Sequence, residues 1–203
     1  MPNPQLLDFP ITAVQRPWDA RLARRLVAPL KDTWVTPNHL TTVRLMVGLG
    51  AAAAFAPGTF GWSNIGALLM VLSNFLDHTD GELARMSGKT SHLGHLYDLA
   101  SDAAVTILAF IAMGIGVGMA GPGLLAGTAI AAIFFLRLRV EEKVGKSGTQ
   151  QASFAGFETE DVLYLAPLVT LCNGVATFIP VSAVCAPLYA LWVTIEYRRV
   201  VAA

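Results

Sequence analysis

The stretch DHTDGELARMSGKTSHLGHLYDLASD, residues 77–102, carries four aspartates in two pairs. The pairs are Asp77 with Asp80 and Asp98 with Asp102, and they lie where two long apolar segments of the chain meet. Carboxylates are costly inside a membrane-embedded bundle and are generally kept there for function. Four of them at one level are expected mainly around divalent cations.

Both halves of this stretch have the spacing of a single helix face. The first half repeats at i, i+3, i+4, i+7 and i+8, and the second at i, i+4 and i+8. The first face consists of Asp77, Asp80, Gly81, Ala84 and Arg85, and the second of Gly94, Asp98 and Asp102. A short turn around Gly88 joins the two helices, so we expect them to run antiparallel as neighbours with all four carboxylates in one pocket.

A pocket of this kind needs positive charge, because carboxylates without cations repel one another and some of them take up protons. Clustered oxygen ligands favour hard cations such as Mg²⁺, Mn²⁺ or Ca²⁺ over zinc. The small residues Gly81 and Ala84 leave room for a flat ligand, although close helix packing in membranes uses the same residue types. Arg85 suits pairing with a phosphate, and a basic anchor at the membrane surface is the alternative reading.

The composition predicts an all-α integral membrane protein. Of 203 residues, 54% are hydrophobic and 14% are charged, whereas soluble domains carry roughly 25% charged residues. The net charge of zero gives no reason to expect nucleic-acid binding. We expect a six-helix bundle with spans at Leu40–Phe55, Phe60–Arg85, Leu93–Gly118, Leu124–Arg139, Asp161–Ala176 and Phe178–Tyr197.

The distribution of charge predicts the orientation of the chain. The expected turns near Pro57, Gly121 and Pro180 carry no charged residues, and the basic residues gather at the other ends of the spans. By the positive-inside rule, both termini and the aspartate end are then cytoplasmic. The expected location is a plasma membrane, such as a bacterial inner membrane.

An amphipathic helix is expected before the first span, within a cytoplasmic segment of residues 1–38. In the range Pro17–Leu30, apolar residues recur every four positions and arginines lie on another face. The apolar residues are Trp18, Leu22, Leu26 and Leu30, and the basic ones are Arg21, Arg24 and Arg25. This pattern favours a helix on the cytoplasmic leaflet, with a surface helix packed on the bundle as the alternative.

Two cysteines, Cys172 and Cys185, have apolar neighbours in the sequence. Free cysteine commonly behaves as a small buried hydrophobic residue. We therefore expect both to lie in the core, and favour this over a disulfide between them.

At the aspartate positions the chain resembles the CDP-alcohol phosphotransferase (CDP-alcohol phosphatidyltransferase) family. The family signature is D-x-x-D-G-x-x-A-R-x8-G-x-x-x-D-x-x-x-D, and the range Asp77–Asp102 matches it at every fixed position. Six spans and an amphipathic start also resemble the membrane domain of the family. The resemblance makes residues 39–203 the catalytic domain, and members of the family are often homodimers.

The resemblance implies an enzyme of phospholipid biosynthesis. It transfers a substituted phosphate, usually the phosphatidyl group of CDP-diacylglycerol, to an acceptor hydroxyl and releases CMP. The implied metal site holds two ions, with Mg²⁺ expected and Mn²⁺ as an alternative, and Asp102 is the implied general base. The implied metal ligands are Asp77, Asp80, Asp98 and Asp102, and the implied CDP site contains Gly81, Ala84, Arg85 and Gly94.

Two further groups of residues are candidates for substrate binding. The segment PNHLTTVR, residues 37–44, resembles a P-N-x-L-T-x-x-R stretch of the family, which makes Asn38, Thr41 and Arg44 candidate nucleotide contacts. A helix cap and a snorkelling arginine are the alternatives there. In relatives that use phosphorylated polyols, basic residues near the end of the fourth span hold the acceptor phosphate. The corresponding residues here are Arg137, Arg139 and Lys143, and the positive-inside rule explains them equally well.

Two other classes of protein also place carboxylates inside membranes. An intramembrane prenyltransferase holds a diphosphate with aspartates and Mg²⁺, but its two motifs usually lie far apart in a longer chain. A divalent-cation transporter needs a second polar vestibule, which the charge-free side of this sequence does not offer. The acceptor remains open among inositol phosphate, glycerol phosphate, serine and amino alcohols, and CDP-choline-type donors share the motif.

Overall fold

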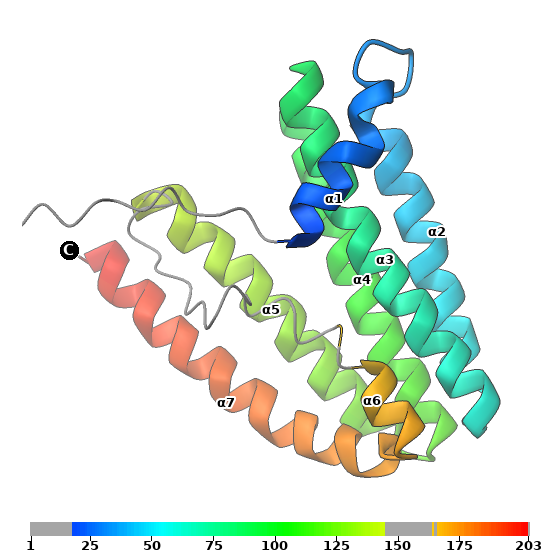
Figure 1. Ribbon diagram of the computed structural model, residues 1–203. Helices are drawn as coiled ribbons and strands as arrows, with labels where there is room; N and C mark the ends of the chain where they lie inside the picture. Colours follow the sequence, from blue (N-terminus) through cyan, green and yellow to red (C-terminus); the bar gives the residue numbers. More distant parts are fainter. Residues whose placement is uncertain (1–17, 145–163, 165, 203) are drawn as a thin grey trace, which may run out of the picture.

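The computed structural model describes residues 18–144, 164 and 166–202. In this part of the chain there are seven α-helices and no strand (Figure 1), as the sequence predicts. A short 3-10 helix, η1 (Ala28–Leu30), directly follows the first α-helix. The α-helices are α1 (Trp18–Val27), α2 (Pro37–Phe55), α3 (Phe60–Ser87), α4 (His92–Gly116), α5 (Ala120–Val144), α6 (Ala166–Leu171) and α7 (Val175–Ala202).

Two of the predicted turns lie elsewhere in the structure. Gly121-Pro122-Gly123 falls inside the first turn of α5, where a proline is tolerated because its nitrogen needs no helical partner. Pro180 lies inside α7. The chain turns instead at Asn173, which has φ of 53° and separates α6 from α7. Prolines are tolerated inside membrane helices, so the left-handed residue, and not the proline, marks this boundary.

Three described helices are long and apolar enough to cross a membrane, namely α4, residues 120–137 of α5 and residues 175–199 of α7. Helix α7 exposes an apolar stripe that suits contact with lipid. The stripe consists of Val181, Val184, Leu188 and Leu191, each more than half exposed. Of the predicted fifth span, Asp161–Ala176, only residues 161–163 and 165 lie outside the described part of the chain. Its predicted end is wrong, because α6 ends at Leu171 and α7 begins at Val175. Since the start of this span is not described, the count of six spans stays a prediction.

Both cysteines are free and exposed, contrary to the expectation that they lie in the core. Cys172 directly follows α6, and Cys185 lies on α7, whose outer face is apolar. In a membrane protein an apolar stretch of sequence can face lipid instead of the core. Apolar sequence neighbours therefore do not show which of the two a cysteine faces.

Helix α2 lies between α3 and α4, packing against each of them, while α3 and α4 have little direct backbone contact. The prediction that α3 and α4 run antiparallel is confirmed, but the prediction that they are direct neighbours is wrong (Figure 1). Small residues on α2 explain the difference. A Cβ added to Gly48 would lie 2.5 Å from Val105 of α4 and 3.0 Å from Ser73 of α3.

The apolar core lies at the end of the bundle away from the aspartates. It includes the second half of α2, the second half of α4, and residues of α3, α5 and α7. Its buried members are Ala51, Ala52, Phe55, Ala67, Met70, Val105, Ala109, Phe110, Ala112, Met113, Ala126, Val175 and Ile179. The core therefore fixes one end of α2, α3 and α4, and leaves the other end to polar contacts.

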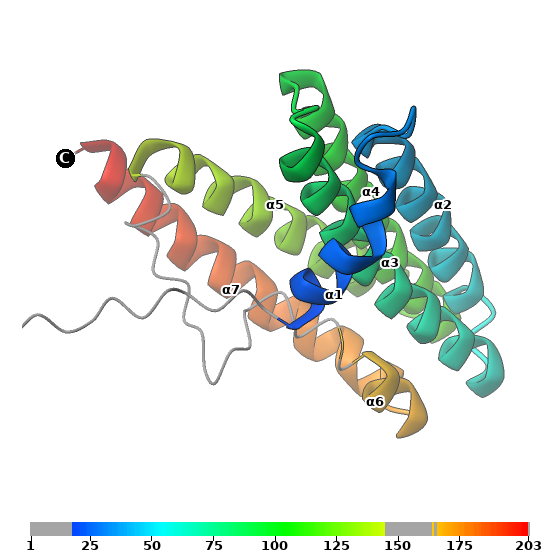
Figure 2. The same ribbon diagram turned by 45° about the horizontal axis from the view of Figure 1, so that its top comes forward.

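Helix α1 packs on α3, and Figure 2 shows it lying across the bundle. Its buried face is formed by Ala20, Ala23 and Val27, whereas Leu22 and Leu26 are exposed. The leucine stripe predicted from the sequence therefore does not hold α1 on the bundle. It faces outward and stays available for the predicted contact with a lipid leaflet.

We predict that Gly48→Leu destabilises the bundle by about 1–3 kcal/mol, because the new side chain cannot fit between α3 and α4 without moving them. The melting temperature of the purified protein in detergent is the measurement. Gly61→Leu is the matched control, because nothing lies within 4 Å of a Cβ added at Gly61. Equal melting temperatures for the two variants would contradict the close approach of α2 to its neighbours.

Candidate active site

The four aspartates of residues 77–102 meet at one level of the bundle, around a single arginine. Helix α3 contributes Asp77 and Asp80, and α4 contributes Asp98 and Asp102. The guanidinium of Arg44, on the intervening helix α2, forms ion pairs with Asp77, Asp98 and Asp102. The predicted convergence of the four carboxylates is thus observed, with a cationic side chain at its centre.

Arg44 is almost fully enclosed by the cluster, with 4% of its side chain exposed. Its Nη2 atom donates to Asp98 Oδ1 at 2.7 Å and to the backbone oxygen of Asp98 at 3.2 Å. Its Nε atom lies 3.8 Å from Asp80 Oδ2. One guanidinium thus faces four carboxylates, and this arrangement leaves an excess of negative charge if all four are ionised.

The carboxylate oxygens fit a divalent cation. One oxygen from each of Asp77, Asp98 and Asp102 lies within 4.8 Å of the other two. Hard cations such as Mg²⁺ prefer such oxygen ligands and add the positive charge that the cluster lacks. These three residues could therefore hold a metal ion.

Asp80 differs from the other three because it is held by the start of α2. Its side chain is 6% exposed, and its Oδ2 atom accepts a hydrogen bond from Thr41 Oγ1 at 2.8 Å. Thr41 is itself buried, and its hydroxyl also lies 3.2 Å from the backbone oxygen of Pro37. The segment that resembles P-N-x-L-T-x-x-R therefore fixes one carboxylate of the cluster.

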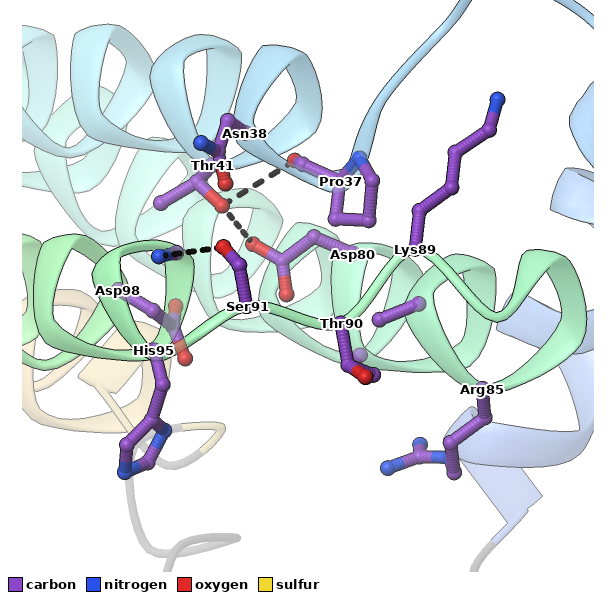
Figure 3. A pocket seen from close by; sticks show the side chains of 13 residues that line it. Pro37, Asn38, Thr41, Asp80, Arg85, Lys89, Thr90, Ser91, His95 and Asp98 are labelled. Atoms are coloured by element: carbon purple, nitrogen blue, oxygen red, sulfur yellow. Dashed lines mark hydrogen bonds between the residues drawn. The ribbon is translucent and has the colours of Figure 1, made fainter.

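A pocket of about 270 Å³ opens beside the cluster, at the ends of α2, α3 and α4 (Figure 3). Two carboxylates of the cluster, those of Asp80 and Asp98, lie in its wall. Six of the seven residues assigned to the CDP site from the sequence also line it. These six are Asn38, Thr41, Gly81, Ala84, Arg85 and Gly94. The seventh, Arg44, lies in the carboxylate cluster and is not among the described residues of the pocket wall.

The two glycines of the wall are packed against polar groups. A Cβ added to Gly94 would lie 2.9 Å from both Asn38 Oδ1 and Ser91 Oγ. A Cβ added to Gly81 would lie 3.5 Å from the guanidinium nitrogens of Arg85. The absence of side chains at these positions therefore lets polar groups from three helices come together at the pocket.

The remaining wall residues were not singled out as site residues from the sequence. They are Pro37, Lys89, Thr90, Ser91 and His95. Ser91 caps α4, accepting from the backbone nitrogen of Gly94 at 3.0 Å. Lys89 donates to the backbone oxygen of Thr33 at 2.7 Å, which ties the α3–α4 turn to the segment before α2. Lys89, Thr90 and Ser91 lie in the eight-residue spacer of the signature, and the spacer specifies only a length, not residue types.

The pocket suits an anion on one side and cations on the other. Arg85 and Lys89 supply positive charge, and the N-terminal end of α4 adds the favourable end of a helix dipole. Asp80 and Asp98 face the same space from the cluster. A phosphorylated ligand that also carries divalent cations matches both sides.

The basic residues assigned to an acceptor phosphate do not join this pocket among the described residues. Arg137 donates to the hydroxyl of Tyr189 on α7, and its guanidinium lies 5.6 Å from the centre of that ring. Arg139 lies 5.1 Å from the centre of the Phe135 ring. Lys143 lies near the end of α5, and its side chain is not among those that the structure describes.

The fold and this site define a helical membrane protein with a carboxylate-lined pocket suited to a phosphorylated ligand. The chain belongs to the CDP-alcohol phosphatidyltransferase family, whose model matches residues 34–196. This range includes α2 to α6 and most of α7, and therefore the whole carboxylate cluster.

Two relatives share part of the chain. Cholinephosphotransferase 1 of Danio rerio is 34% identical over 90 residues, which cover 40% of this chain and 23% of the relative. CDP-diacylglycerol–glycerol-3-phosphate 3-phosphatidyltransferase of Cereibacter sphaeroides is 34% identical over 79 residues, which cover 38% of this chain and 36% of the relative. The matches thus span well under half of each relative's length.

Proposed function

We propose that the protein transfers a substituted phosphate from a CDP-alcohol to an acceptor hydroxyl and releases CMP. The observation that carries this proposal is the shared wall of the pocket. Asp80 and Asp98 of the carboxylate cluster lie there with six residues assigned to the CDP site. This arrangement supports a nucleotide diphosphate bound beside the carboxylates, where its phosphorus is attacked.

The metal ligands in this proposal are Asp77, Asp80, Asp98 and Asp102. When bound, two Mg²⁺ ions supply the positive charge that neutralises the diphosphate and the leaving CMP. Arg85 and Lys89 lie in the wall of the pocket, where their charge attracts and orients the phosphates. Asn38 and Gly94 lie next to each other in this wall, where they are the proposed contacts of the nucleotide.

Asp102 is the proposed general base. It belongs to the carboxylate cluster but is not among the described residues that line the pocket. A carboxylate in this place accepts the proton of the acceptor hydroxyl at Oδ1 or Oδ2 as the oxygen attacks phosphorus. As a base, Asp102 acts on the acceptor, in addition to its proposed place among the metal ligands.

The proposed donor is CDP-diacylglycerol, in a membrane-spanning bundle of six helices with the pocket and both termini on the cytoplasmic side. The pocket end is polar and the opposite end apolar, which supports a diphosphate in water and acyl chains in the bilayer. The name of one relative includes CDP-diacylglycerol and that of the other cholinephosphotransferase, so both donor types remain candidates. The acceptor is proposed only as a small alcohol, and a homodimer is the proposed assembly.

The test is an acceptor screen with purified protein, Mg²⁺ and CDP-diacylglycerol, which measures release of radiolabelled CMP. Glycerol phosphate, inositol phosphate, serine and choline are the first acceptors, and CDP-choline with diacylglycerol is the second donor system. Release that depends on one acceptor supports the proposal. An intramembrane prenyltransferase or a cation transporter would release no CMP under any of these conditions.

We predict that Gly94→Ala raises the KM for the CDP donor by about tenfold, which corresponds to about 1.4 kcal/mol. The added Cβ would meet Asn38 Oδ1 and Ser91 Oγ at 2.9 Å, so both groups must move at the pocket wall. Steady-state kinetics with varied donor is the measurement, and Gly61→Ala is the matched control. An unchanged donor KM would place the nucleotide away from Gly94.

A further inference from the structure

Glu82 is a buried carboxylate outside the cluster, and its position is unspecified in the family signature. It lies on α3 between Gly81 and Leu83, and only 2% of its side chain is exposed. It is one of the few large side chains in the described residues that are almost completely enclosed. A buried carboxylate is costly unless charged partners compensate for the lost water.

Two arginines from different parts of the fold reach Glu82. Arg85 Nη2 donates to Glu82 Oε1 at 2.9 Å, one helical turn further along α3. Arg24 Nη1, on the amphipathic helix α1, lies 3.8 Å from Glu82 Oε2. Both arginine side chains are about half exposed, whereas the Glu82 carboxylate between them is buried.

The same contact restricts Arg85 at the pocket. Arg85 is part of the pocket wall (Figure 3). Its guanidinium nitrogens lie 3.5 Å from a Cβ built on Gly81. A long arginine side chain at half exposure has many rotamers, and an ion pair to a fixed carboxylate reduces their number. The enclosed Glu82 thus sets the direction in which Arg85 presents its charge.

Helix α1 is placed to contribute to this arrangement. Ala20, Ala23 and Val27 bury its inner face on α3, and Arg24 follows Ala23 directly. With α1 packed on α3, Arg24 lies beside the Glu82 oxygen that Arg85 does not contact in the 2.9 Å hydrogen bond. The amphipathic helix therefore contacts the donor pocket through a single intervening carboxylate.

We propose that Glu82 is a positioning residue that holds Arg85 toward the diphosphate of the CDP donor, and that Arg24 of docked α1 supports Glu82 in this role. The inference rests on the proposed function for the identity of the donor. It adds two residues to donor binding that the signature does not specify. It also makes docking of α1 part of the donor site.

The experiment uses the full chain, purified and reconstituted, and compares Glu82→Gln and Arg24→Gln with the control Arg25→Gln. Arg25 lies next to Arg24 on α1 and is exposed, so its loss removes the same charge from the helix. Calorimetry with CDP gives the affinity, and steady-state kinetics with CDP-diacylglycerol separates donor KM, acceptor KM and kcat. Melting temperatures are measured on the same samples.

For Glu82→Gln we expect about a tenfold weaker CDP affinity and a similarly raised donor KM, as for loss of one charge-assisted hydrogen bond. The acceptor KM should stay within about twofold because the pair acts on the donor side of the site. Arg24→Gln should weaken CDP binding by about threefold, a typical effect for a half-exposed ion pair, and Arg25→Gln should not. Arg85→Gln should weaken CDP binding by a smaller factor in the Glu82→Gln background than in the unmodified protein, because the two residues act as one unit.

Several results would overturn the inference. A lower melting temperature for Glu82→Gln with unchanged CDP affinity would make Glu82 a purely structural residue. Equal losses of CDP affinity in Arg24→Gln and Arg25→Gln would show that α1 acts only through its total charge. If Glu82→Gln does not fold, Glu82→Asp keeps the charge but shortens its reach, and normal CDP binding by that variant would also overturn it. Absence of CMP release by the unmodified protein would count against the proposed function, while CDP calorimetry would still test the role of Glu82.

Discussion

Replacing Asp98 with asparagine is expected to abolish CMP release while the fold is retained. Among the described residues, Asp98 alone belongs both to the set of three carboxylates that could hold a metal ion and to the wall of the pocket. Asparagine has nearly the same shape but lacks the negative charge, so it should hold a cation and the adjoining donor poorly. Changes in residues that merely support metal ligands cost about 10–100-fold, so a loss above about 100-fold is expected here.

The measurement is radiolabelled CMP release at saturating Mg²⁺, with the melting temperature as a check on folding. Asp32→Asn is the matched control, because the Asp32 side chain is 85% exposed and its ion pair, at 3.7 Å, is with the neighbouring Lys31. The control should keep full turnover. Near-normal turnover by Asp98→Asn would show that the carboxylate cluster is not the metal site.

Asp102→Asn is expected to lower kcat by about 10²–10⁴-fold, the usual contribution of a general base. Its effect on donor affinity should be much smaller, because Asp102 belongs to the cluster but not to the described pocket wall. Kinetics with varied CDP-diacylglycerol and calorimetry with CDP separate the two effects. Equal losses in kcat and in CDP affinity would assign Asp102 to binding alone.

The helical spacing of residues 77–102 was enough to predict the carboxylate site. A helix places i, i+4 and i+8 on one face whatever surrounds it, so the two aspartate stripes follow from local geometry. The left-handed Gly88 ends α3, and the Ser91 cap starts α4, which fixes the turn between them. These are local features, and the structure places the four carboxylates together as the spacing predicted.

The place of Arg44 could not be derived in this way. Its spacing from the aspartates along the chain carries no information about which side chains it meets. That depends on α2 lying between α3 and α4, and Gly48 and Ser73 show how small residues permit this close approach. The sequence resemblance assigned Arg44 to the nucleotide, and such a contact remains a prediction.

The face of α1 that packs on α3 could not be predicted for a related reason. Leucine at every fourth position predicts an apolar stripe, but alanine and valine on the next face allow closer packing against α3. Which apolar face is buried is then decided by the partner helix and not by the pattern itself. The same ambiguity between lipid and core explains the exposed cysteines.

The most direct test of the carboxylate site is the electron paramagnetic resonance spectrum of Mn²⁺ bound to the purified protein in the presence of CDP. We expect two bound Mn²⁺ ions per chain in the unmodified protein, a reduced number in Asp98→Asn, and displacement of both ions by excess Mg²⁺. Identical Mn²⁺ binding by the two proteins, or no bound Mn²⁺ in either, would contradict a metal site formed by these aspartates.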